Sequence, residues 1–220
     1  MPNFYKSSEH HCSHGTALTA AVPCPHATLK THADHNPPHL MSKILKVPLE
    51  PFLPGSPERR PFVLLAFVSG LQCDPAALQK ALGTLDCALV NATLIAGPQP
   101  FIAALHRSLQ NYRKACMKTR SIYTELLFAL SPSTNVTESL KTFGLGTGDA
   151  PLLAVRFFSD DADQFAQDLR AQLHCHIDDL PALEDIGRFA RRAEIARLFR
   201  TTDGAHLDRE CCSVLASKGI

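Results

Sequence analysis

The sequence predicts an α/β fold: one small domain in which a few-stranded mixed sheet is covered by several short helices. Two almost entirely apolar segments, 62–68 and 151–158, are typical of buried strands. Patterns of helical period alternate with these strands along the chain, and that alternation indicates helices packed on a sheet. Hydrophobic residues make up 45% of the 220 residues, which is enough for a core.

Residues 1–40 differ from the rest of the chain. They contain seven of the eleven histidines and five prolines, with only a weak apolar pattern. Such a composition cannot bury enough apolar surface to offset the loss of chain entropy. We therefore predict a disordered His- and Pro-rich extension over 1–40 and a folded domain over 41–220.

The first half of the domain begins with a strand. Residues 44–49 form an edge strand, because Pro48 cannot donate a hydrogen bond inside a sheet. A proline-rich loop leads to the buried strand 62–68. An Asp-Pro pair then provides an N-cap and a first helical residue for a helix over 74–82. Residues 88–96 are extended.

Three helices are predicted in the middle of the chain. The longest, 100–117, has one apolar side, which comprises Phe101, Ala104, Leu105, Leu109, Tyr112 and Cys116. A second helix covers 122–130 and is stopped by Ser-Pro. A third covers 135–143, with a polar cap that resembles a capping box, and Gly144 ends it.

The last elements follow a glycine-rich turn over 144–149. This turn comes after a helix and before a strand, which is the wrong order for a dinucleotide-binding loop. The elements after it are the strand 151–158, a helix over 161–173, a short strand over 174–180, an arginine-rich helix over 181–199 and a final helix over 206–217.

The helix over 122–130 is apolar on two sides. Its two stripes are Ile122, Leu126 and Leu130, and Tyr123, Leu127 and Phe128. A single core does not readily cover both, and soluble monomers rarely leave large apolar patches exposed. One stripe should therefore pack on the sheet and the other should contact a partner. The sequence does not indicate which stripe faces outward.

The segment around this helix resembles a known family. It reads M-K-T-R-S-I-Y-T-E-L-L-F-A-L-S-P at 117–132 and N-V-T-E-S-L-K-T-F-G at 135–144. In this order of residues it is similar to the kinase-binding subunit of the EKC/KEOPS complex, the family of PRPK-binding proteins (TPRKB family). The likeness extends over 43–220, including the C-C-S-V-L signature at 211–215, and does not include residues 1–40.

The resemblance implies a non-catalytic accessory subunit of the EKC/KEOPS complex. Such a subunit binds and regulates a small atypical kinase/ATPase of the PRPK type and supports threonylcarbamoyl-adenosine modification of tRNA. It implies contacts with other EKC/KEOPS subunits, contact with tRNA through the complex, and a location in nucleus and cytoplasm. It implies no cofactor. From the two stripes we predict Ile122, Tyr123, Leu126 and Leu127 as partner-binding residues.

Charge limits the contact with nucleic acid. Lys plus Arg number 22 and Asp plus Glu 21, a net charge of +1, which is low for a protein that binds nucleic acid alone. Lys114, Lys118 and Arg120 form a local basic corner that we predict to contact tRNA. A solvated helix end is the alternative reading. A larger basic set lies in the arginine-rich helix, where i,i+4 pairs with acidic residues can neutralise it: Arg188, Arg191, Arg192, Arg197 and Arg200.

No catalytic site, metal site or membrane segment is predicted. The longest apolar run, 62–68, is about a third of the roughly 20 residues that span a bilayer. Two C-x-H pairs, at 12–14 and 24–26, favour adventitious chelation over a structural zinc site, because paired ligands are normally spaced more widely. His174 and His176 would share a face of a strand but have no third ligand nearby in sequence.

Two alternative functions stay open. The first is an adaptor that binds a protein kinase outside tRNA modification. The second is a small metal or redox protein that uses the His- and Cys-containing extension. The eight cysteines show no disulfide framework, and the pair Cys211 and Cys212 is read as one thiol in the core and one at its edge.

Overall fold

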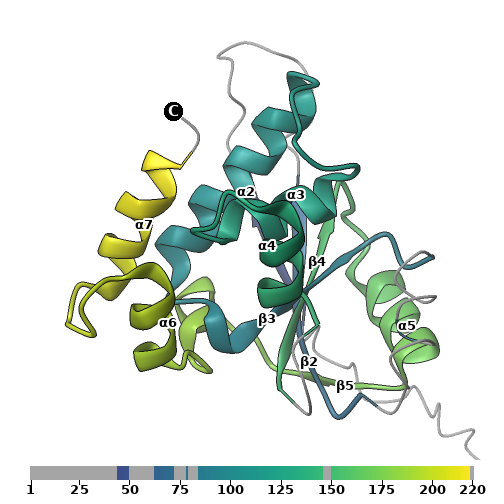
Figure 1. Ribbon diagram of the computed structural model, residues 1–220. Helices are drawn as coiled ribbons and strands as arrows, with labels where there is room; N and C mark the ends of the chain where they lie inside the picture. The colour runs from purple at the N-terminus through teal and green to yellow at the C-terminus, as the bar shows by residue number, and fades with distance from the viewer. Residues whose placement is uncertain (1–43, 50–61, 72–77, 79–83, 146–149, 219–220) are drawn as a thin grey trace, which may run out of the picture. The chain divides into compact units, whose positions relative to one another are not determined.

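The apolar segment that follows the proline-rich loop forms the central strand of the sheet in the computed structural model (Figure 1). This strand, β2 (Phe62–Ser69), pairs along one side with β4 (Leu152–Phe157). On its other side it pairs with β1 (Leu45–Pro48) and, further along, with β5 (His176–Asp178). Strand β3 (Ala88–Asn91) pairs with the far side of β4. The predicted α/β class is confirmed. All these pairings are antiparallel, whereas a mixed sheet was predicted.

The structure describes residues 44–49, 62–71, 78, 84–145 and 150–218. All of them belong to one compact unit, 39–220. The predicted extension over 1–40 and the proline-rich loop lie outside the described residues, so the division into extension and domain stays a prediction. Of the helix predicted over 74–82, only Leu78 is described.

The helical segments are α2 (Pro98–Arg113), α3 (Ile122–Leu130), α4 (Val136–Phe143), α5 (Ala162–Leu173), α6 (Arg192–Phe199), α7 (Leu207–Ser217) and the 3₁₀ turns η1 (Ala92–Leu94) and η2 (Leu183–Gly187). The predictions for α3, α4, α5 and α7 are confirmed to within one residue. Gly144 ends α4 as predicted, and a Cβ on it would lie 2.5 Å from the Leu140 carbonyl oxygen.

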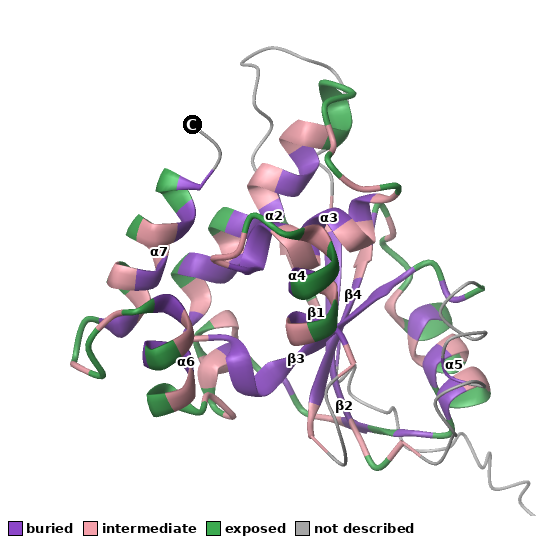
Figure 2. Cartoon of the chain, viewed as in Figure 1, coloured by how far each residue is buried: buried purple, intermediate pink, exposed green. Residues whose placement is uncertain are grey.

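Helices cover both faces of the sheet, which is why the central strand is apolar on both sides. Successive side chains of a strand point to opposite faces. Val63, Leu65 and Phe67 of β2 lie in a large core with residues of α2, α3, α4, α6 and α7. The alternate residues of β2 lie in a second core with Phe165 and Leu169 of α5. The inner strands β2, β3 and β4 are accordingly buried along most of their length (Figure 2).

The longest helix differs from its predicted span of 100–117. It begins two residues earlier, at Pro98, and ends at Arg113. Ala115 takes a left-handed conformation (φ 51°), and the Cys116 N–H donates to the Asn111 carbonyl at 2.9 Å. Cys116 lies beyond the helix and is exposed. Tyr112 was predicted on the core side; it lies within α2 but is 48% exposed.

The single helix predicted over 181–199 is wrong. The segment forms η2, an irregular stretch and then α6. Contacts distant in sequence cause the break: the Arg191 N–H donates to the Thr93 carbonyl at 2.8 Å, and the Phe189 ring meets the Phe67 ring edge-on at 4.9 Å. A Cβ on Gly187 would lie 3.2 Å from the Ala96 carbonyl oxygen, so glycine permits this close approach.

Two predicted extended segments are shorter than expected. The segment 88–96 is a strand only to Asn91, whose side chain accepts hydrogen bonds from the N–H and hydroxyl of Thr93 and starts η1. The segment 174–180 is a strand only over β5. His174 is the left-handed C-cap of α5 (φ 47°), so it does not share a strand face with His176. Within the described residues, no helix is both long and apolar enough to cross a bilayer.

Candidate partner-binding surface

The N-terminus of α3 is fixed by a capping box. The Ser121 hydroxyl accepts from the Thr124 N–H at 3.2 Å, and the Thr124 hydroxyl accepts from the Ser121 N–H at 3.2 Å. Two backbone donors that a helix start would otherwise leave without partners are satisfied in this way. The sequence signal is present in the S-I-Y-T order but uses Thr in place of the more usual Glu or Gln.

One side of α3 belongs to the core of the domain. Leu126 is fully buried, and Ile122 and Leu130 are 6% and 3% exposed. All three pack in the large core beneath the sheet-facing side of the helix. Two of the four predicted partner-binding residues, Ile122 and Leu126, therefore lie inside the domain.

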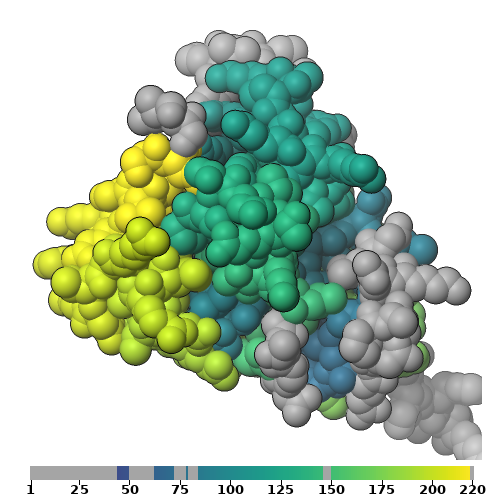
Figure 3. All heavy atoms as spheres, viewed as in Figure 1, coloured from purple at the N-terminus to yellow at the C-terminus, as the bar shows by residue number. Residues whose placement is uncertain are grey.

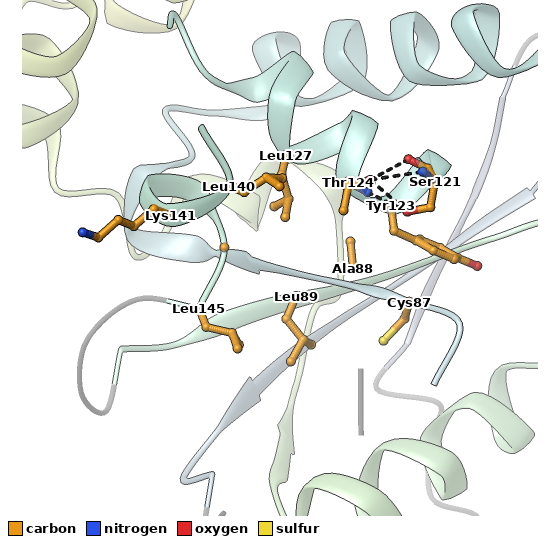
Figure 4. Close-up of a pocket in the computed structure, with 11 residues that line it drawn as sticks. Cys87, Ala88, Leu89, Ser121, Tyr123, Thr124, Leu127, Leu140, Lys141 and Leu145 are labelled. Carbon is orange, nitrogen blue, oxygen red and sulfur yellow. Dashed lines mark hydrogen bonds between the residues drawn. The ribbon is translucent and has the colours of Figure 1, made fainter. Parts of the chain in front are cut away.

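The other side of α3 is partly open. Tyr123 and Leu127 are half-buried and line a groove of about 510 Å³ between α3, α4 and β3 (Figure 4). The remaining lining residues are Cys87, Ala88, Leu89, Ser121, Thr124, Leu140, Lys141, Gly144 and Leu145. In Figure 4, Leu127 lies near Leu140, and the Lys141 side chain points away from both. The groove walls are mainly apolar, with one cation at the rim.

The floor of the groove keeps its titratable groups protonated. Burial, together with the nearby Asp86 and Cys87, raises the pKa of Tyr123 to about 12. Burial also raises the pKa of the Cys87 thiol to about 12. The Tyr123 ring packs against Phe157, with centroids 6.0 Å apart. Both side chains are therefore uncharged at neutral pH.

The predicted tRNA-contacting residues lie in the connection between α2 and α3. Lys114 is the C-cap of α2, and Lys118 and Arg120 follow in the loop. All three side chains are exposed, and none forms an ion pair or a side-chain hydrogen bond among the described residues. The structure thus places all three at exposed positions of the connection between α2 and α3, and this set of three is named the basic corner.

A buried carboxylate holds the basic corner, and the sequence interpretation missed it. Glu125 on α3 is fully buried. Its carboxylate accepts from the Lys118 and Thr119 N–H groups, both at 3.0 Å, from the Thr119 hydroxyl at 2.8 Å, and from the Asn111 amide at 2.8 Å. The only sequence signal for this role was the presence of one acidic residue in a helix that is otherwise mostly apolar.

A second buried charge fastens α7 to α3. The Lys218 ammonium donates to the carbonyls of Phe128 and Ser131 at the end of α3 and lies over the Phe128 ring. Arg107 of α2 donates to the carbonyls of Leu215 and Lys218. Burial and the like charge of Arg107 lower the pKa of Lys218 to about 8. No sequence pattern predicted this contact, because it joins residues about 90 positions apart.

The arginine-rich segment is engaged more fully than the basic corner. Arg188 lies over the rings of Phe67 and Phe189 at 4.5 and 4.7 Å. Arg192 pairs with Asp203 at 3.3 Å, and Arg191 lies 3.7 Å from Glu194. The sequence predicted that acidic neighbours at i,i+4 positions would neutralise these arginines. Arg191 and Arg192 do have acidic partners, but at other spacings.

The cysteines and histidines of the described residues form no metal-binding cluster of three or more ligand-type side chains. The two C-x-H pairs lie outside the described residues. Cys211 is buried in the core and Cys212 is half-buried at its edge, as predicted. Burial raises the pKa of the Cys211 thiol to about 12.

A protein-family model described as "Kinase binding protein CGI-121" matches residues 73–219. The EKC/KEOPS complex subunit TPRKB of Danio rerio is 33% identical over 67 residues, 30% of this chain and 38% of that protein. The EKC/KEOPS complex subunit cgi121 of Aspergillus fumigatus is 26% identical over 116 residues, 51% of this chain and 61% of that protein. The CGI121 subunit of Yarrowia lipolytica is 29% identical over 69 residues, 31% of this chain and 41% of that protein. The chain thus spans from over a third to under two thirds of the length of these relatives.

Proposed function

This chain belongs to the family of the kinase binding protein CGI-121, and from that membership we propose that it is a non-catalytic accessory subunit of an EKC/KEOPS complex. In this proposal it binds and regulates the atypical PRPK-type kinase of the complex. Its partners include the other EKC/KEOPS subunits, and it acts in the nucleus and the cytoplasm.

The observation that carries the proposal is the open side of α3. Tyr123 and Leu127 lie within the matched span and line an apolar groove of about 510 Å³. The helix start is fixed by its capping box, and the stripe on its other side is buried in the core. Tyrosine is enriched among interface hot spots, so a half-buried Tyr123 in an apolar groove supports a partner-binding role for this surface. In the space-filling view, α3 and α4 form the middle of the displayed face (Figure 3).

We further propose that the basic corner contributes to tRNA binding by the assembled complex. Lys114, Lys118 and Arg120 are exposed and are not paired with the described acidic residues. Free cations contact phosphates at no cost of breaking internal ion pairs. Three charges on a chain of net charge +1 supply a local contribution, so other subunits must provide most of the phosphate contacts.

Affinity purification of the full chain from cell extract, with identification of the co-purifying proteins, tests the proposal. An atypical small kinase together with other EKC/KEOPS subunits and tRNA supports it. The same kinase without those subunits supports the alternative adaptor outside tRNA modification. Absence of any kinase contradicts both. The Leu127→Arg variant, which should stay folded and lose the kinase, is the control for a specific contact.

A further inference from the structure

Glu125 is a buried carboxylate with no ion-pair partner among the described residues. It is fully buried on a helix whose other inward residues are apolar. A buried carboxylate is strongly destabilising unless hydrogen bonds or opposite charges compensate it. The Lys218 ammonium, which lines the same pocket as Glu125 without a direct ion pair, is one such charge. An apolar residue here would fill the core without that cost. The position of the carboxylate therefore requires an explanation.

The hydrogen bonds of Glu125 converge from one loop. Oε2 accepts from two successive N–H groups, those of Lys118 and Thr119, and from the Thr119 hydroxyl at 2.8 Å. Oε1 accepts from the amide of Asn111 on α2. Consecutive backbone N–H groups that point at one oxygen form an anion-binding concavity, and here the anion belongs to the protein.

The first part of the same loop is held by the Cys116 N–H, which donates to the Asn111 carbonyl, and by Met117, which packs against the large core. Ala115 takes the left-handed conformation at its start, and the Thr119 hydroxyl also lies 3.1 Å from the Ser121 carbonyl at its end. Among the described residues, the backbone N–H groups of Lys118 and Thr119 both donate to the Glu125 carboxylate. The carboxylate thus sets the backbone that carries the Lys118 and Arg120 side chains.

A favourable interaction with the N-terminus of α3 is the simpler explanation, because Glu125 lies in the first turn of the helix. That interaction needs proximity to the helix start and no contact with the loop. It does not account for four hydrogen bonds from outside α3, three of them from the loop that holds the basic corner.

We propose that Glu125 is a positioning residue for the basic corner. It fixes the 118–120 backbone so that the exposed cations on either side of Thr119 are presented together to a phosphate backbone. This inference rests on the tRNA contact of the proposed function. Glu125 itself contacts no nucleic acid, since it is fully buried.

The test compares Glu125→Gln with Glu138→Gln, which makes the same chemical change at an exposed position on α4. Glutamine keeps the shape of glutamate but replaces one acceptor oxygen with a donor that faces other donors. We expect trypsin to cleave the native chain after Lys118 and Arg120 about tenfold faster in Glu125→Gln, by loss of about 1.4 kcal/mol of local protection. Glu138→Gln should match the wild type. Unchanged cleavage at both sites overturns the inference.

The second measurement is tRNA affinity of the assembled complex at several salt concentrations. Glu125→Gln should weaken tRNA binding severalfold and leave kinase co-purification intact. Reversal of both charges, Lys118→Glu with Arg120→Glu, should weaken it further and reduce the salt dependence. If the reversal has no effect, the proposed tRNA contact fails and this inference fails with it. If the reversal weakens binding and Glu125→Gln does not, only the inference about Glu125 fails.

A milder variant distinguishes a local effect on the loop from a general loss of stability. Thr119→Val removes one hydroxyl donor to Glu125 and leaves the buried carboxylate and its other hydrogen bonds in place. We expect this variant to keep the thermal stability of the wild type and to show an intermediate increase in cleavage after Lys118 and Arg120. If Glu125→Gln and Thr119→Val change cleavage only in proportion to a lower melting temperature, the role of Glu125 is general stability and the inference is overturned.

Discussion

The two sides of α3 carry similar apolar residues in different surroundings. Leu126 is fully buried beneath the helix, whereas its sequence neighbour Leu127 is half-buried and lines an open groove. Successive residues of a helix are about 100° apart, so neighbours of the same type can have opposite roles. Apolar character alone thus does not separate a core residue from a partner-binding residue.

The two basic regions teach the same lesson for charge. Arg188 and Arg192 contact aromatic rings, a carboxylate and a carbonyl of the domain. The side chains of Lys118 and Arg120 extend into solvent. The backbone of their loop is bound to the domain through the hydrogen bond from the Lys118 N–H to Glu125. A cation that already has internal contacts is less available to a partner. The basic corner is therefore a better candidate for contact with tRNA phosphates than the arginine-rich segment.

The largest expected effect is at the buried side of α3. Leu126→Ala should destabilise the domain by about 2–5 kcal/mol, because the core cannot fully close the resulting cavity. Leu127→Ala should cost under about 1 kcal/mol, since its side chain already borders open space. Urea unfolding of the two variants measures the difference. Equal losses would show that the two sides are not distinct.

The next effect concerns kinase binding. Leu127→Arg should reduce kinase affinity by about 30-fold or more, about 2 kcal/mol, as expected at an interface hot spot. Its melting temperature should stay within about 2 °C of the wild type, because the arginine can extend into the groove. Leu198→Arg, at a half-buried leucine on α6, is the matched control and should retain the kinase. Normal binding by Leu127→Arg would place the kinase contact elsewhere, with α7 as the next surface to test.

A smaller effect is expected at the helix cap, which supports both sides of α3 equally. Ser121→Ala removes the hydroxyl that accepts from the Thr124 N–H. The loss should be about 1 kcal/mol, which lowers the melting temperature by about 2–4 °C for a domain of this size. Thermal denaturation with Ser217→Ala as the control, at an exposed serine near the end of α7, isolates the capping contribution. A drop no larger than that of the control would contradict a stabilising cap.

The smallest expected effect at neutral pH is that of Tyr123→Phe, whose influence on the melting temperature should appear only at alkaline pH. The pKa of Tyr123 is raised by burial from 10.0 to about 12. A raised pKa stabilises the fold below pH 10, and this contribution is lost as the pH rises toward 12, because the unfolded chain releases its proton first. Tyr123→Phe should therefore differ little in melting temperature at pH 8 and should gain relative to the wild type at pH 11. A constant difference between the two would show that Tyr123 is not shielded from water.

The local elements were determined by the sequence alone. The two apolar strands, the Ser-Pro stop of α3, the Asn135 cap of α4 and the final helix all depend on neighbours within a few positions. Short-range hydrogen bonding and side-chain period suffice for these. The M-K-T-R block likewise indicated a family that the matched span of 73–219 confirms.

Tertiary contacts decided the rest. Docking of 187–191 onto the segment after β3 divided the predicted helix over 181–199. Only packing could assign Leu126 to the core and Leu127 to the groove, because both stripes of α3 are apolar. The buried charges of Glu125 and Lys218 are satisfied by groups that the chain brings together only when it folds. A buried charge needs partners in three dimensions, and sequence order does not specify them.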